Sequence, residues 1–212
     1  LLVIVCMLFL FAVTEDALAA TYSPKAVTSR TTDTVTKGKL VKKKKGTVYQ
    51  LSGGKLLKGT WARIKGNVYC FKSSGYAQTG EFKYKGKEYF ADDNGIVYVD
   101  RFRKETGILY YYQPDGSKLT GGDWMMIRGG YYFGKRGTNG NLMTDTWVSN
   151  RYLGEDGRNV TDAIVDGRVI GPTGDLQSPA ETDRYVIVGA SRIQDMSRVV
   201  NGRNTLFICK AG

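Results

Sequence analysis

The sequence predicts a mainly β protein, in which stacked β-hairpins form a solenoid that is followed by an incomplete α/β segment. Three observations support this prediction. Of the 25 aromatic residues, 20 lie between Tyr49 and Tyr152. A spacing of Trp, Gly and Tyr recurs in this stretch, and glycine-containing turn sequences separate its copies. Because a lone hairpin is marginally stable in water, we expect the hairpins to stack and bury their rings against one another.

The first residues have the features of an incomplete secretory signal peptide. Residues 1–13 are a short uncharged apolar run, and Ala17-Leu18-Ala19 has the A-x-A form of a cleavage site. The run is too short to cross a bilayer comfortably. We therefore expect residues 1–19 to direct secretion, with no stable membrane insertion after cleavage; a buried helix is the alternative. Since no Met or basic n-region precedes the run, the sequence is expected to be a fragment of a longer protein.

The net charge of +11 is concentrated near the N-terminus, where residues 21–59 hold ten Lys or Arg against one acid, Asp33. The Lys42–Lys45 run lies at the centre of this basic segment, and residues 20–45 are predicted to be a basic linker. One interpretation is a solvated segment. The other is a segment attracted to an anionic polymer such as teichoic acid, or to a membrane surface. No nucleic-acid recognition motif accompanies the charge, so nucleic acid is not an expected partner.

The clearest repeat has the form W-x4-G-x2-Y-x-F-x3-G-x4-G and runs from Trp61 to Gly80. The alternation in Val68-Tyr69-Cys70-Phe71 predicts a strand, and the glycine-containing turn sequences on either side predict a hairpin. Weaker or altered copies begin at Gly46, Phe82, Gly107, Trp124 and Trp147. Residues 46–157 are therefore predicted to be a series of β-hairpin repeats, in which glycine permits positive φ and a close approach of neighbouring turns.

These repeats resemble the cell-wall-binding repeat family, the choline-binding and glucan-binding repeats of Gram-positive surface proteins, over residues 46–157. The resemblance implies a wall-associated protein whose ligands lie between successive hairpins, against aromatic side chains. An aromatic face attracts a quaternary ammonium by cation–π interaction, and it also stacks on the apolar face of a sugar. The residues expected to line such sites are Trp61, Tyr69, Phe71, Tyr89, Tyr110, Tyr112, Trp124 and Trp147.

The repeats depart from the choline-binding pattern at one position. Such repeats usually carry a second Trp two residues after the hairpin glycine, where this sequence has Val68 in one unit and Leu109 in another. The difference disfavours choline and favours a glucan or a peptidoglycan-associated polymer as the ligand. A purely architectural role, in which the rings fill the space between hairpins, stays open.

The C-terminal part is predicted to be a linker over residues 158–184 and the start of an α/β domain over residues 185–212. The linker is rich in Gly and Pro and has few apolar residues. The apolar run 184–189 predicts a buried strand, and residues 205–209 predict a second, with a loop and a helix between them. Two strands and one crossover do not complete such a domain.

The segment 185–192 resembles the opening block of the SGNH/GDSL hydrolases, in which the Ser of Gly-Asp-Ser is the nucleophile. Ser191 and Gly189 match that block, whereas Ala190 replaces its Asp. The resemblance implies that Gly212 is the glycine whose backbone N–H enters the oxyanion hole. The alternative is a strand followed by an ordinary turn serine.

Any catalytic activity would need residues outside this sequence. A serine needs a base to become a useful nucleophile, and the sequence has no His, so the fragment itself is expected to be inactive. The absence of His, with three widely spaced Cys, also means that no metal or other cofactor is expected. Two functions stay open: a wall-anchored serine esterase, and a non-catalytic wall-binding or surface-adhesion module.

Overall fold

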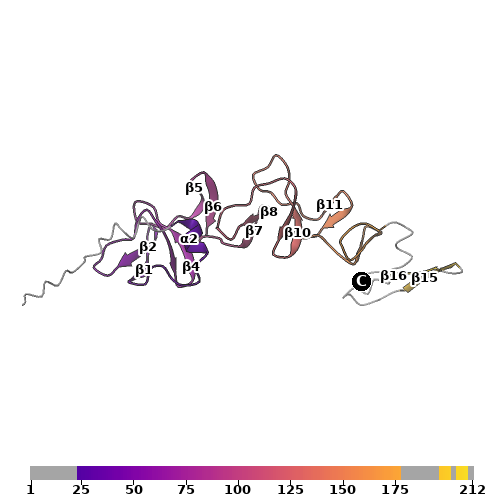
Figure 1. Cartoon of the computed structure of the whole chain (residues 1–212), viewed down its shortest axis with the longest axis horizontal. Helices are drawn as coiled ribbons and strands as arrows, with labels where there is room; N and C mark the ends of the chain where they lie inside the picture. Colours follow the sequence, from indigo (N-terminus) through magenta and orange to yellow (C-terminus); the bar gives the residue numbers. More distant parts are fainter. Residues whose placement is uncertain (1–22, 178–195, 202–203, 210–212) are drawn as a thin grey trace, which may run out of the picture. The chain divides into compact units, whose positions relative to one another are not determined.

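The computed structural model describes residues 23–177, 196–201 and 204–209 of the chain (Figure 1). These residues are mainly β, which confirms the predicted fold class, and each sheet is a single pair of consecutive strands. Two compact units divide the chain: an N-terminal unit with residues 23–102 and 111–119, and a C-terminal unit with residues 103–110 and those from 120 onward. Each unit is described by itself, and a solenoid over the whole chain stays a prediction.

The N-terminal unit begins with one short helix and continues with three hairpins. The helix is α2 (Pro24–Thr28), whose N-terminus is capped by the Ser23 hydroxyl accepting from the Ala26 N–H. The strands are β1 (Gly38–Lys43) with β2 (Gly46–Leu51), β3 (Trp61–Ile64) with β4 (Asn67–Cys70), and β5 (Gly80–Tyr84) with β6 (Lys87–Ala91).

The fourth hairpin contributes residues to both units, and the hairpins that follow it belong to the C-terminal unit. The shared hairpin pairs β7 (Arg101–Glu105) with β8 (Ile108–Tyr112). The following pairs are β9 (Trp124–Ile127) with β10 (Gly130–Phe133), β11 (Thr146–Val148) with β12 (Arg151–Leu153), β13 (Ala163–Val165) with β14 (Arg168–Ile170), and β15 (Met196–Asn201) with β16 (Asn204–Cys209).

The hairpin turns explain why glycine recurs at a fixed place. At Lys65-Gly66, between β3 and β4, φ is 51° and 77°. Positive φ at both central residues is what a type I′ turn requires, and this turn matches the twist of a hairpin. The same pair of positive φ values occurs at Lys85-Gly86, Thr106-Gly107, Arg128-Gly129 and Asp166-Gly167.

Within each unit, the loop after a hairpin is hydrogen-bonded to the hairpin before it. In the N-terminal unit the N–H of Ala77, which follows β4, donates to the Thr47 carbonyl in β2 at 2.8 Å. In the C-terminal unit the Asn159 N–H donates to the Tyr131 carbonyl at 2.8 Å. The corresponding pairs are Val97 to Val68, Lys118 to Glu88, Leu142 to Leu109, and Leu176 to Asn150. This repeated bond joins neighbouring hairpins within a unit.

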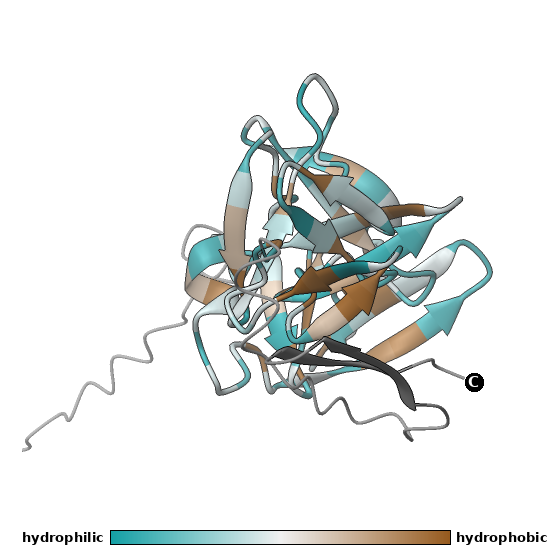
Figure 2. Cartoon of the chain, turned by 90° about the vertical axis from the view of Figure 1, so that its right-hand side faces the viewer, coloured by the Kyte–Doolittle hydropathy of each residue, from teal (hydrophilic) through white to brown (hydrophobic). Residues whose placement is uncertain are grey.

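Side chains alternate along the strands, as the hairpin prediction requires. In β5, Phe82 and Tyr84 are half-buried, whereas Glu81 and Lys83 are exposed. Individual strands accordingly carry both hydrophobic and hydrophilic positions (Figure 2). In the N-terminal unit, two clusters of buried hydrophobic residues accordingly combine side chains from neighbouring hairpins.

The hairpins extend past both predicted boundaries of the repeat region. Residues 20–45 were expected to be a linker, yet they contain α2 and the whole of β1. The lysines of β1 stay exposed while Leu40 packs against the core, so the strand tolerates its charge. Residues 158–184 were also expected to be a linker, and they contain β13 and β14 on either side of the Asp166-Gly167 turn. These three-residue strands are shorter than most strands, which explains why the sequence pattern missed them.

The C-terminal end also differs from the prediction. Residues 205–209 lie in β16 as expected, but β16 pairs antiparallel with β15, where a loop and a helix were predicted. The sequence Asn201-Gly202 lies between two apolar segments, and Asn-Gly favours a hairpin turn over a helical crossover. The strand predicted at 184–189, Ser191, Gly212 and the signal peptide all lie outside the described residues. None of the described helices is long and apolar enough to cross a membrane.

Candidate functional site

Trp61 lies at the centre of a closed group of rings in the N-terminal unit. Its side chain is 0% exposed, and its ring centroid is 5.0 Å from that of Tyr89, 5.5 Å from Tyr84 and 5.8 Å from Phe82. These rings come from β3, β5 and β6, so two successive hairpins supply them. We call Trp61, Phe82, Tyr84 and Tyr89 the Trp61 cluster. Because its rings pack on one another, the cluster forms part of the core between these hairpins.

Most of the aromatic residues predicted to bind ligand are buried in the structure. Tyr112, for example, is 0% exposed and packs with Phe90 and Tyr98. The buried members of the predicted set are Trp61, Tyr69, Phe71, Tyr89 and Tyr112. The half-buried members are Tyr110, Trp124 and Trp147. Only the second group therefore presents ring surface to solvent in this state of the protein.

Among the residues of the C-terminal unit whose burial is described, those of the β9–β10 hairpin include the most exposed aromatic side chain, Tyr131. Trp124 pairs across the strands with Phe133, and Met126 pairs with Tyr131, so strand alternation places all four on one face. Tyr131 is 43% exposed and Met126 is 66% exposed. We call these four residues the β9–β10 aromatic face. Large apolar side chains gathered on an exposed surface are typical of a binding site.

An arginine from the next hairpin lies over this face. The Arg151 guanidinium carbon is 5.4 Å from the Trp124 ring centroid and 5.5 Å from that of Tyr131. The same side chain donates from Nε to Asp175 Oδ1 at 2.8 Å and from Nη2 to Oδ2 at 3.3 Å. These hydrogen bonds, with one from Thr173, hold the pKa of the Asp175 carboxyl below its ordinary value. The carboxylate therefore fixes the guanidinium in place.

The same combination occurs one hairpin further along. The Arg168 guanidinium carbon, from β14, is 5.0 Å from the ring centroid of Trp147 in β11. Trp147 Nε1 donates to Asp166 Oδ2 at 3.1 Å, and its ring lies against Tyr152 at 5.3 Å. The Tyr152 hydroxyl donates to Asp145, and this bond to a carboxylate raises the pKa of Tyr152 to about 12.

A hollow of about 470 Å³ adjoins Arg151 in the C-terminal unit. Tyr131 supplies an aromatic wall, and the polar wall is formed by Arg151, Arg158, Asn159 and Asp175. Its other lining residues are Gly129, Gly130, Thr161, Pro172 and Thr173. An aromatic surface beside planar hydrogen-bonding groups suits a sugar, which offers an apolar ring face and hydroxyls. This hollow and the β9–β10 aromatic face together form the candidate site.

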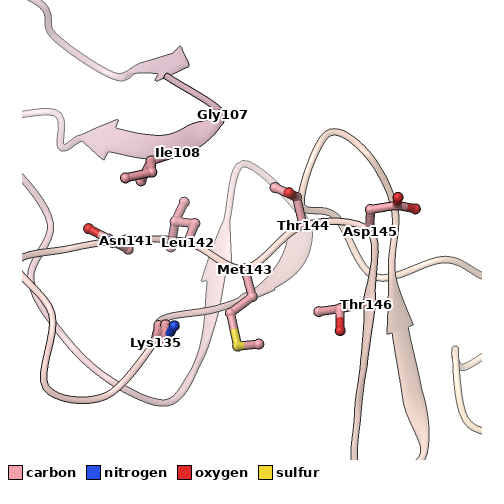
Figure 3. A pocket seen from close by; sticks show the side chains of 9 residues that line it. All are labelled: Gly107, Ile108, Lys135, Asn141, Leu142, Met143, Thr144, Asp145 and Thr146. Carbon is pink, nitrogen blue, oxygen red and sulfur yellow. The ribbon is translucent and has the colours of Figure 1, made fainter. Parts of the chain in front are cut away.

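A second hollow of about 420 Å³ lies elsewhere in the C-terminal unit (Figure 3). Its charged lining residues are Lys135 and Asp145, which Figure 3 shows on different sides of it. The rest of its lining is Gly107, Ile108, Asn141, Leu142, Met143, Thr144 and Thr146. It contains no aromatic residue, so it offers no stacking surface for a sugar.

Four exposed lysines form the tip of the first hairpin in the N-terminal unit. Lys42 and Lys43 end β1, and Lys44 and Lys45 form the turn to β2. We call them the lysine tip. The nearest acid in the sequence, Asp33, accepts hydrogen bonds from the backbone N–H groups of Lys65 and Gly66, which lower its pKa. No Asp or Glu occurs between residues 34 and 80, so the sequence around the tip is uniformly basic.

The remaining chemistry in the described region is structural. Cys70 is 5% exposed, and its burial raises the pKa of the thiol to about 12, so it is not a reactive nucleophile. No group of His, Cys, Asp or Glu among the described residues is arranged to hold a metal ion. Arg151 and Asp175 are site residues that the sequence did not predict. Nothing in their sequence positions marks them, because Asp175 lies in the predicted linker and the contact joins different hairpins.

No protein-family model matches the chain, and no curated protein matches it. Solved structures similar to it include choline-binding protein F from Streptococcus pneumoniae, at 26% identity and a TM-score of 0.49, over 68% of this chain and 49% of that one. The modular autolysin LytC from S. pneumoniae is 23% identical, with a TM-score of 0.49, over 66% and 33% of the two chains. CbpJ from S. pneumoniae TIGR4 is 22% identical, with a TM-score of 0.49, over 66% and 48%. This chain therefore covers less than half of each of these proteins.

Proposed function

We propose that this protein is a secreted, wall-associated module that binds wall polysaccharide through the candidate site of its C-terminal unit. The observation that carries the proposal is the exposed β9–β10 aromatic face beside a polar hollow. Tyr131 would stack on the apolar face of a sugar ring. Arg151, Arg158 and Asp175 would hydrogen-bond its hydroxyls. The repeats resembling cell-wall-binding repeats support the same interpretation.

Retention on purified cell walls, and on glucan and peptidoglycan fragments, tests this function. We expect Tyr131→Ala to weaken retention about tenfold, which corresponds to about 1.4 kcal/mol. Tyr76→Ala, which removes a half-buried tyrosine from the N-terminal unit, is the matched control and should retain binding. Equal retention of the two variants would contradict a site at Tyr131. Absence of binding to any of these polymers by the unmodified protein would leave only the architectural role.

The lysine tip supports a second contact, with an anionic wall polymer of the teichoic acid type. Four adjacent exposed ammonium groups attract a polyphosphate by electrostatics that salt screens. Replacing all four with Gln should weaken binding to teichoic acid and flatten its dependence on salt concentration. Replacing Lys135 and Lys104, two exposed lysines of the C-terminal unit, should leave both unchanged. Preferential binding to anionic lipid vesicles would instead favour a membrane surface as the partner.

The esterase hypothesis stays a prediction. It rests on the sequence match at Gly189 and Ser191, which lie outside the described residues, as does the oxyanion candidate Gly212. A serine-reactive fluorophosphonate should label full-length protein at Ser191. Labelling that survives Ser191→Ala would contradict the assignment. If the fluorophosphonate labels no serine, the protein would be a non-catalytic wall-binding or adhesion module.

A further inference from the structure

The C-terminal unit repeats one arrangement of tryptophan and arginine. In each case the tryptophan lies in the first strand of a hairpin, and the arginine is the first residue of the second strand of the next hairpin. Arg151 in β12 lies over Trp124 in β9, and Arg168 in β14 lies over Trp147 in β11. The two guanidinium groups are 5.4 and 5.0 Å from the ring centroids. The recurrence indicates a built feature of this unit.

The position of Arg151 is fixed from two sides. A cation within about 6 Å of a ring centroid is attracted by the negative face of the ring, and Arg151 meets this condition for both Trp124 and Tyr131. On its other side, Asp175 accepts two of its hydrogen bonds. The carboxylate is itself held by Asn150 Nδ2 at 3.2 Å and Thr173 Oγ1 at 2.9 Å. Only 26% of the Arg151 side chain is exposed, so solvent competes little for it.

We propose that Arg151 is a built-in cation, which takes the place over Trp124 and Tyr131 that the cationic group of a ligand would occupy. It thereby determines specificity, because a quaternary ammonium group is excluded from these rings while they stay occupied. The adjoining hollow is left to uncharged or anionic sugars, which the Arg151–Asp175 pair can hydrogen-bond. This choice of ligand class rests on the proposed function, whereas the occupancy by Arg151 does not.

The three tryptophans of the chain provide a direct test. Each gives one indole N–H signal in a nitrogen–proton NMR spectrum, so Trp61, Trp124 and Trp147 are observed separately. Tetramethylammonium chloride is titrated into the protein, with sodium chloride at equal ionic strength as the reference. In the unmodified protein we expect no saturable shift of the Trp124 signal. In Arg151→Gln we expect a saturable shift of that signal in the millimolar range, with the buried Trp61 signal unchanged.

Three further variants make the outcome decisive. Arg151→Lys keeps a cation over the rings and should block tetramethylammonium, as the unmodified protein does. Arg136→Gln removes an arginine of the same unit whose side chain is 78% exposed and which lies over no described ring, and it should also behave like the unmodified protein. Asp175→Asn removes the carboxylate that fixes Arg151, and should give a partial response even if Arg151→Gln folds poorly. A saturable shift in the unmodified protein, or none in Arg151→Gln and Asp175→Asn, would overturn the proposal.

Wall-polysaccharide binding is measured separately on the same samples. If tetramethylammonium binds only after Arg151 is replaced, the occupancy by Arg151 is supported whether or not the polysaccharide binds. Failure of the unmodified protein to bind any polysaccharide contradicts the proposed function alone. The two proposals can therefore be contradicted independently of each other.

Discussion

The two units use the same repeat sequence to build aromatic groups of opposite character. In the N-terminal unit the next hairpin supplies Phe82, Tyr84 and Tyr89, and Trp61 becomes fully buried. In the C-terminal unit the next hairpin supplies Arg151, which lies over a half-buried Trp124 and lines a hollow. The repeat therefore specifies where a tryptophan lies on a hairpin. The side chains of the following hairpin decide whether it belongs to the core or to a surface site.

Removing the central ring from each unit should give the largest difference between them. We expect Trp61→Ala to lower the free energy of unfolding by about 3–5 kcal/mol, because it leaves a cavity in a packed core. Trp124→Ala should cost about 1–2 kcal/mol, since its ring is only half-buried in the folded protein. Urea denaturation, with hydrogen exchange resolved by peptide, measures the loss and locates it. An equal loss of unfolding free energy in the two variants would contradict the proposed difference between the two units.

The loop glycines should show the next largest effect. Gly95 has φ of +86°, and an added Cβ would lie 2.5 Å from the Cβ of Ala77 in the preceding loop. Gly137, in the C-terminal unit, has φ of +71° and open space around it. Gly137→Ala should cost about 1 kcal/mol from backbone strain alone. Gly95→Ala should cost about 2–4 kcal/mol, because overpacking adds to the strain. Melting curves of the two variants check the difference.

Removing one charge from an ion pair in each unit should give a smaller difference in stability between the units. The Lys118 side chain is 4% exposed, and its Nζ lies 2.8 Å from Glu88 Oε2. Removing a charge from this largely buried pair by Glu88→Gln should destabilise the protein by about 1–3 kcal/mol. The pair of Lys104 with Glu155 in the C-terminal unit is exposed, so Glu155→Gln should change stability by less than about 0.5 kcal/mol. A large effect of Glu155→Gln in denaturation experiments would contradict this ranking.

Alkaline pH should destabilise the N-terminal unit, which contains the Trp61 cluster. Burial raises the pKa of Tyr89 from 10.0 to about 12, and that of the nearby Cys70 thiol from 9.0 to about 12. Unfolding releases both protons at lower pH than the folded state does. The stability that the neutral groups contribute is therefore complete below pH 9 and is lost as the pH rises to about 12. Denaturation midpoints over this range, with mass-spectrometric mapping of Cys70 alkylation, test it; rapid alkylation of folded protein at pH 9 would contradict the assignment.

The sequence predicted the hairpins well wherever the local signals were complete. The Lys65-Gly66 turn and the strands beside it follow from alternation and turn chemistry, which are local properties. The short strands β13 and β14 were not predicted, because three residues are too few to show the alternation of a strand. The site was harder to predict. Trp61 and Trp124 look alike in sequence, and the residues that distinguish them lie in another hairpin.

The hydrogen bonds from each loop to the preceding hairpin have a consequence for how the chain folds. The bond from Ala77 to Thr47 and the bond from Asn159 to Tyr131 each join residues about thirty positions apart, so the tertiary contacts they mark are short in sequence. Low contact order favours rapid folding, because little loop entropy is lost before a contact forms. Within each unit, a newly synthesised hairpin can form these contacts as soon as the preceding hairpin has folded. We therefore expect each unit to fold progressively during synthesis, from its first hairpin to its last.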